Sequence, residues 1–179
     1  WAMQQPDGET RHAAIGSVAS ALAPQAPLEA ARLAAPLPAG PAQSNAVQNG
    51  ASAWAASDPP SAANWVAGFA DGSLRDAAVQ RILPAWASTD ATAAGAWLKT
   101  LPPTPGRDSA VMTYMNQLTY QSPELAAPWV AAITKPETRQ AAIENLTRQW
   151  LQVDRRAAEL WLAQTSLPED RKQRLLQGR

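Results

Sequence analysis

The spacing of tryptophan is the feature that most limits what this chain can fold into. Its eight tryptophans fall into two series in which successive positions are 32 residues apart, and each series is interrupted only by leucine, at Leu33 in the first and at Leu22 and Leu118 in the second. A fixed period of roughly 20–50 residues is typical of repeat architectures. The first series comprises Trp1, Trp65, Trp97, Trp129 and Trp161, and the second comprises Trp54, Trp86 and Trp150.

Each period has the pattern of a helical hairpin. Asp58 is suited to the N-cap of a first helix and Pro59 to its first turn, where the missing N–H costs nothing. Ala62, Trp65 and Val66 then recur on one helical face. A second helix is expected over 73–87. No segment alternates with period two, and the abundant alanine favours helix over strand.

Stacked hairpins would share a continuous core, since one hairpin cannot bury its apolar face alone. The sequence therefore predicts an all-α fold: a right-handed α-solenoid of about five and a half antiparallel helical hairpins with a period of 32 residues. We expect residues 1–179 to form one array, and because neither end resembles a polar capping repeat, the array is expected to be a piece of a longer protein. The expected units are 1–25, 26–57, 58–89, 90–121, 122–153 and 154–179.

Prolines mark local departures from this pattern. Pro36, Pro38 and Pro41 crowd one hairpin turn, so the first helix there should end by Ala35. Pro128 lies inside an expected first helix and should kink it or delay its start.

The repeat resembles the tetratricopeptide class in its general plan of paired helices with small residues at the crossing. It is more similar to the Trp- and Ala-rich helical-hairpin arrays of large bacterial proteins, whose units open with D-P-x-x-A-x-x-W, found here at Asp58, Pro59, Ala62 and Trp65. The resemblance implies an interaction scaffold. It does not define the compartment, and an exported bacterial protein is one of the alternatives.

Composition argues against several function classes. Fifteen basic and fifteen acidic residues give a formal charge of zero, so no polybasic surface for nucleic acid is indicated. No stretch of the sequence is both long and apolar enough to span a bilayer. There is no cysteine, and His12 is the only histidine, so no metal site, cofactor site or catalytic group is expected. His12 is expected to face solvent, because Asp76 and Asp108 share its repeat position. We therefore expect no enzymatic activity.

A recurring arginine is the most conspicuous charged feature. It could form a groove for a polyanion, but a structural role is favoured, because each arginine begins a second helix. There it can donate to the free carbonyls that end the preceding first helix and lie over the nearby tryptophan. The tryptophans are expected to be core rather than stacking platforms, and Asp58, Asp90 and Asp154 to be helix caps. The column comprises Arg11, Arg75, Arg107, Arg139 and Arg171.

These observations favour a non-enzymatic protein–protein interaction scaffold, with a structural spacer or shell subunit of a larger assembly as the alternative. First-helix positions off the apolar stripe vary between units, as a partner-reading groove requires; one such position comprises Asn64, Ala96, Pro128 and Leu160, and the other Ala67, Lys99, Ala131 and Ala163. Residues 135–179 carry nine basic and six acidic groups, which could dock an acidic protein partner. The candidate partner-binding residues are Asn64, Lys99, Arg155, Arg156, Arg171, Lys172 and Arg174.

Overall fold

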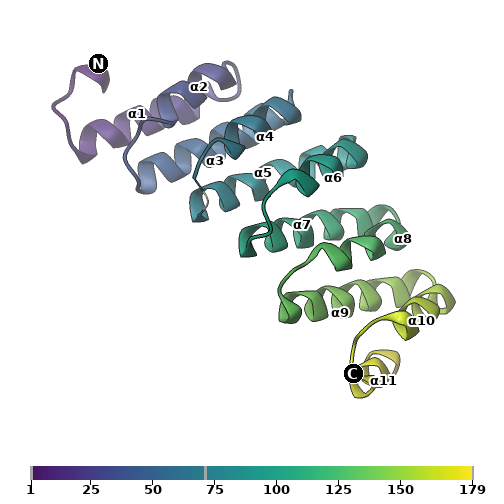
Figure 1. The fold of residues 1–179 in the computed structure, drawn as a ribbon. Helices are drawn as coiled ribbons and strands as arrows, with labels where there is room; N and C mark the ends of the chain where they lie inside the picture. The colour runs from purple at the N-terminus through teal and green to yellow at the C-terminus, as the bar shows by residue number, and fades with distance from the viewer. Residues whose placement is uncertain (1, 71, 179) are drawn as a thin grey trace. The chain divides into compact units, whose positions relative to one another are not determined.

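The protein is all-helical. A computed structural model describes residues 2–70 and 72–178, in which eleven α-helices and two short 3₁₀ helices occur without any β-strand (Figure 1). Trp1 of the first tryptophan series lies outside the described residues. The chain divides into two compact units, residues 1–94 and residues 95–179, with the boundary inside helix α6 (Ala91–Thr100).

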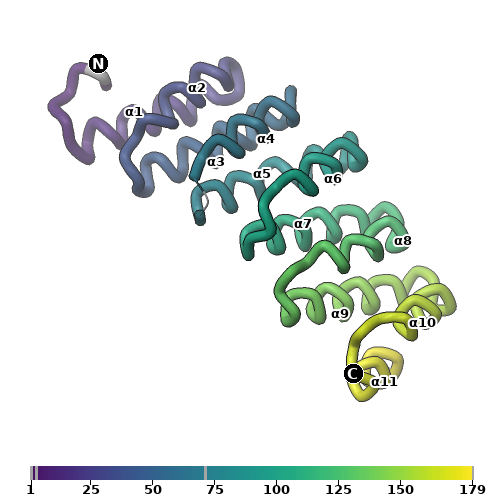
Figure 2. The backbone as a smooth tube through the Cα atoms, viewed as in Figure 1, coloured from purple at the N-terminus to yellow at the C-terminus, as the bar shows by residue number. Residues whose placement is uncertain are grey.

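The first unit has two layers of helices. The longer helices α1, α3 and α5 pack side by side, while the shorter α2 and α4 pack against them (Figure 1). Consecutive helices are joined by short turns and reverse direction at each one (Figure 2). The elements are η1 (Ala2–Gln4), α1 (Glu9–Leu22), α2 (Pro27–Ala34), α3 (Pro41–Ala55), α4 (Pro59–Ala67) and α5 (Ser73–Thr89).

The second unit repeats the alternation of long and short helices. Helix α7 packs on α9, and the short elements between them, α8 and η2, contact both. Helix α10 packs on α9, and α11 contacts α9 and α10. The elements after α6 are α7 (Pro105–Gln121), α8 (Pro123–Ala126), η2 (Ala127–Ala132), α9 (Pro136–Val153), α10 (Arg155–Gln164) and α11 (Glu169–Leu176).

The helix starts follow from local sequence. The expected caps are confirmed, because Asp58, Asp90 and Asp154 each accept a hydrogen bond from the backbone N–H three residues on, at 3.1, 2.9 and 3.0 Å. Gly8 and Gly72 precede α1 and α5 at equivalent repeat positions, with φ of 152° and 150°. Glycine suits these turns because its missing Cβ makes such backbone angles accessible.

One expected proline effect is confirmed, and the other takes a different form: Pro128 neither delays the helix start nor is directly followed by further α-helix. Helix α2 ends at Ala34, just before Pro36. Helix α8 ends at Ala126, and the chain continues as the 3₁₀ helix η2, which contains Pro128. A proline removes an N–H donor and clashes with the preceding turn, so the tighter 3₁₀ form replaces the α-helix here.

Two glycines that face tryptophans give a paired prediction. A methyl group on Gly95 would lie 2.7 Å from both the Trp129 ring and the Tyr114 hydroxyl, whereas one on Gly50 would lie 3.5 Å from Trp65, an ordinary contact. Gly95→Ala should therefore lower the free energy of unfolding by about 1–3 kcal/mol through overpacking. Gly50→Ala should raise it by about 0.5–1 kcal/mol, because alanine favours helix. Urea unfolding of both variants tests the opposite signs, and destabilisation by Gly50→Ala would contradict the packing argument.

Candidate functional site

Each unit contains a surface cleft of about 430 Å³, and the two clefts share six equivalent repeat positions. The first-unit cleft lies between α1 and the end of α2; the second-unit cleft lies between α9 and the end of α10. Every lining residue of the first set below is separated from its counterpart in the second by four periods of 32 residues. The first set is Arg11, Ile15, Leu33, Pro36, Leu37 and Pro38, and the second is Arg139, Ile143, Trp161, Gln164, Thr165 and Ser166.

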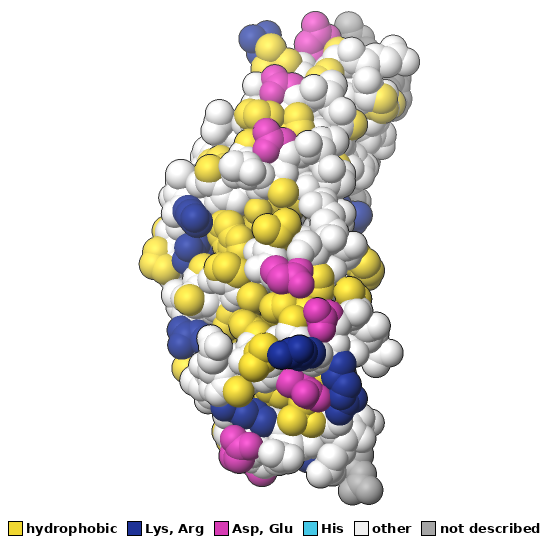
Figure 3. All heavy atoms as spheres, turned by 90° about the vertical axis from the view of Figure 1, so that its right-hand side faces the viewer, with side chains coloured by type: hydrophobic (Ala, Val, Ile, Leu, Met, Phe, Trp, Pro, Cys, Tyr) yellow, Lys and Arg dark blue, Asp and Glu magenta, His cyan; other side chains and the backbone are white. Residues whose placement is uncertain are grey.

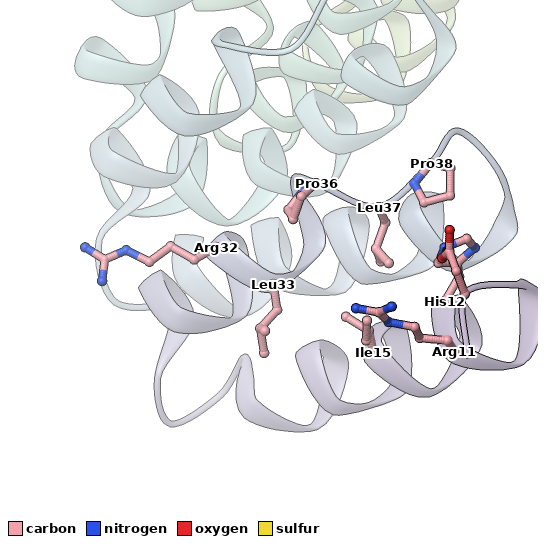
Figure 4. A pocket seen from close by; sticks show the side chains of 9 residues that line it. Arg11, His12, Ile15, Arg32, Leu33, Pro36, Leu37 and Pro38 are labelled. Atoms are coloured by element: carbon pink, nitrogen blue, oxygen red, sulfur yellow. Dashed lines mark hydrogen bonds and ion pairs between the residues drawn. The ribbon is translucent and has the colours of Figure 1, made fainter. Parts of the chain in front are cut away.

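Both clefts contain an arginine of the repeating column, but in different states. The Arg139 guanidinium donates through Nε and Nη2 to the carbonyl oxygen of Ile133, at 2.9 and 2.7 Å. Arg11 makes no hydrogen bond or ion pair within the described part of the chain, and its guanidinium lies in the cleft near Ile15 and Leu37 (Figure 4). The first cleft therefore presents an unsatisfied cation, and the second does not.

Arg107 links two successive hairpins of the second unit. Its Nε donates to the Leu98 carbonyl at 3.4 Å, near the end of α6, and its Nη1 donates to the Ala132 carbonyl at 3.3 Å, at the end of η2. Both carbonyls belong to the group that a helix end leaves without internal partners. Arg75 of the same column is buried, and Arg171 pairs with Glu144 at 2.7 Å.

Arg107→Ala should lower the free energy of unfolding by about 1.5–3 kcal/mol, the range for hydrogen bonds to a charged group. Arg107→Lys should recover less than half of this, because one ammonium group lacks the planar fork that reaches both carbonyls. Thermal melts at low and high salt check the prediction. If the lysine variant melts with the wild type while the alanine variant does not, charge alone would explain the effect and the two-carbonyl account would be wrong.

The tryptophans are not uniformly buried. Trp86 and Trp150 are buried, whereas Trp54, Trp65, Trp97, Trp129 and Trp161 are half-buried. The ring pairs nevertheless recur. Trp54 packs on Trp65 with centroids 6.0 Å apart at 38°, and Trp150 packs on Trp161 at 5.6 Å and 37°.

Trp129 has different neighbours because Leu118 of the preceding helix, α7, stands where the second series would place a tryptophan. Its ring packs edge-on against Tyr114 with centroids 4.6 Å apart, and Lys99 Nζ lies 5.1 Å from its centroid. A lysine, rather than the expected arginine, thus forms the described cation–π contact. This assigns Lys99, one of the candidate partner-binding residues, to an intramolecular contact that leaves the residue exposed. Asn64, another candidate, is exposed on α4.

Asp108 has a role that the sequence did not indicate. Only 1% of it is exposed, and its carboxylate accepts hydrogen bonds from the Thr134 N–H, the Thr134 hydroxyl and the Lys135 N–H at 2.8–2.9 Å. Burial alone raises the pKa of Asp108, but these bonds and the nearby Arg107 outweigh it, so the pKa lies below its ordinary value. Asp108 therefore ties α7 to the loop after η2.

His12, which shares the repeat position of Asp108, is also less exposed than expected. The histidine side chain is about 25% exposed rather than open to solvent, and its Nε2 lies 3.0 Å from the Asp7 carboxylate.

Most of the basic candidates near the C-terminus hold α11 in place. Arg171 pairs with Glu144 of α9, and Lys172 donates to the Ala163 carbonyl of α10 at 3.1 Å. Arg155 pairs with Glu159 at 2.8 Å and donates to the Leu176 carbonyl at 3.2 Å. These interactions give Arg171, Lys172 and Arg155 partners within the unit, while residues 135–179 keep their excess of basic over acidic groups. Arg174 pairs with Asp170 within α11 at 2.8 Å, and Arg156 is exposed on α10.

Two of the first-helix residues that were expected to vary with the partner line the second cleft. Pro128 and Ala131 line it, and Leu160 of the same series is 61% exposed. The cleft is therefore walled by variable first-helix residues, by Trp161 and by the α9 residues Arg139 and Ile143.

Over the described residues, no cluster of three or more His, Cys, Asp or Glu side chains is placed to hold a metal ion. Within the same residues, every helix is too short or too polar to cross a membrane.

Comparison of the chain with protein-family models, with curated proteins and with solved structures gives no match.

Proposed function

We propose that the protein is a non-enzymatic protein–protein interaction scaffold, built as a right-handed solenoid of helical hairpins in the general manner of tetratricopeptide arrays. The observation that carries the proposal is the recurrence of one cleft at equivalent repeat positions in the two units. A repeat protein that binds extended partners offers the same kind of surface from successive units. Recurrence of the tilted tryptophan pairs supports the same repeat.

Exposed apolar side chains favour protein as the ligand. Tyr120, Leu125, Val153 and Leu160 of the second unit are each more than half exposed, with Tyr120 at 81%. Apolar surface of this kind is typical of interaction sites. The face drawn in Figure 3 carries hydrophobic side chains mixed with both acidic and basic ones, in contrast to the single-sign surface that a nucleic-acid-binding protein presents.

Blocking the second-unit cleft tests the proposal. Ala131 lines the cleft and is exposed, whereas Ala141 is also exposed but lies on α9 outside the lining. Ala131→Trp should fill the cleft, and Ala141→Trp is the matched control. We expect affinity purification from the source proteome to recover a stoichiometric partner with the wild type and with Ala141→Trp, and to lose it with Ala131→Trp.

The alternative, a structural spacer or shell subunit, gives a different result. A spacer is held by its ends and edges, so both tryptophan variants should recover the same larger assembly as the wild type. That outcome would overturn the scaffold proposal in favour of the spacer.

A further inference from the structure

The first-unit cleft differs from its second-unit counterpart in two ways, and both concern what could occupy it. Leu33 stands where the second cleft has Trp161, so the cleft lacks an indole ring. Arg11 stands where the second cleft has Arg139, but no hydrogen bond joins Arg11 to a backbone carbonyl within the described residues, whereas Arg139 donates to the Ile133 carbonyl. Compared with the second cleft, the first thus lacks one indole ring and one arginine–carbonyl contact.

The walls of the first cleft are apolar around Arg11. Ile15 and Leu37 are buried, Leu33 is half-buried, and Pro36 and Pro38 complete the lining (Figure 4). A volume of about 430 Å³ lies within the usual range of small-molecule sites. Flat aromatic rings bury a large apolar area against such walls.

Other charged groups in the cleft do not compete for Arg11. Among the described residues the lining contributes one carboxylate, that of Asp7, which lies 3.0 Å from His12 Nε2. Arg32 lies at the rim, and its side chain points away from Arg11 (Figure 4). The guanidinium of Arg11 is therefore available for a bidentate contact with an incoming carboxylate.

We propose that this cleft binds an aromatic carboxylate, with the ring against Ile15, Leu33 and Leu37 and the carboxylate on Arg11. The ligand could be a free aryl-alkyl acid or the C-terminal aromatic residue of a peptide chain, since both present a ring joined to a carboxylate. This site goes beyond the scaffold proposal. The scaffold test blocks only the second-unit cleft, whereas the titrations below address only the first, so failure of one is distinguishable from failure of the other.

Calorimetric or NMR titration with indole-3-propionate tests the proposal, and its neutral amide is the control. A ligand of this size should bind with a Kd of about 1 mM. The amide should bind at least about tenfold more weakly, because it loses the charge-assisted contact. Absence of binding at about 10 mM, or equal binding of acid and amide, would overturn the proposal.

Three variants locate the site. Arg11→Gln should weaken binding of the acid at least about tenfold while leaving the thermal melt unchanged, since Arg11 has no described internal partner. Arg32→Gln, which removes a charge pointing away from the cleft, should change the Kd less than about twofold. Leu33→Trp should restore the repeat pattern and abolish binding. Binding that survives both Arg11→Gln and Leu33→Trp would place the ligand elsewhere and refute the assignment.

Acetyl-glycyl-tryptophan with a free carboxylate distinguishes the two sources. If it binds more tightly than indole-3-propionate, the site is built for a chain terminus; if it binds more weakly, the site is built for a free acid. Either ranking supports the shared chemistry, provided that Arg11→Gln weakens both.

Discussion

Replacing Trp150 by alanine is expected to lower the free energy of unfolding by about 3–5 kcal/mol, the usual cost of truncating a buried aromatic side chain. Trp150 lies on α9, is 5% exposed and packs on Trp161 of α10. Trp161 in turn packs against the buried cluster that holds α9, α10 and α11 together, formed by Ile143, Leu162, Leu167 and Leu175. The loss should therefore loosen the last two helices as well as α9, and urea unfolding followed by circular dichroism measures it.

Trp150→Phe is the informative control. The indole Nε1 of Trp150 is buried and has no hydrogen-bond partner among the described residues. An unsatisfied buried donor costs about 1–3 kcal/mol, and phenylalanine removes that donor while keeping most of the apolar ring. The phenylalanine variant should stay within about 1 kcal/mol of the wild type, because the lost area and the removed penalty offset one another. A phenylalanine variant as unstable as the alanine variant would contradict this account.

Asp108→Asn should lower the free energy of unfolding at pH 7 by about 2–4 kcal/mol. The carboxylate accepts three hydrogen bonds from Thr134 and Lys135, and bonds to a charged group contribute about 1.5–3 kcal/mol each. An asparagine of the same shape keeps one acceptor, but its NH₂ group opposes the remaining donors. Thr134→Val, which removes only the hydroxyl donor, should cost about 1 kcal/mol and serves as the graded comparison.

The effect of Asp108→Asn should depend on pH in a defined direction. The pKa of Asp108 in the folded protein is lowered, whereas an unfolded aspartate titrates near about 3.9. The stabilisation is therefore complete above about pH 5 and is lost as the pH falls below about 4 through the folded-state pKa. Urea unfolding at several pH values should show the difference between wild type and variant shrinking in acid. A difference that is constant down to about pH 2 would exclude the carboxylate charge as its source.

Helix positions were largely predictable from the sequence because their signals are local. The caps at Asp58, Asp90 and Asp154, the end of α2 before Pro36 and the break at Pro128 each depend on residues within a few positions. The varying first-helix positions pointed to the second cleft through Pro128 and Ala131. Such positions follow from helical periodicity alone.

The contacts of Asp108 were not predictable, because its main partners are backbone N–H groups that every residue except proline carries. The repeat position that Asp108 shares with His12 was expected to face solvent, but Asp108 is buried. The pairing of Arg171 was not predictable for a related reason: Glu144 lies 27 residues before it, and periodicity does not indicate such a contact. The partial exposure of the first tryptophan series depends on how far each ring extends beyond its neighbours. The helical periodicity of the sequence shows which face a ring lies on, but not how far the ring extends.

The loop that follows η2 has a consequence for hydrogen exchange. Amides just beyond a helix end commonly exchange fast, but the Thr134 and Lys135 N–H groups are held by the carboxylate of a residue on α7, 26 and 27 positions earlier. Their deuterium uptake requires that contact to open, and not the local fraying of a helix. The exchange rates of these two amides would therefore report directly how often α7 separates from the hairpin that follows it.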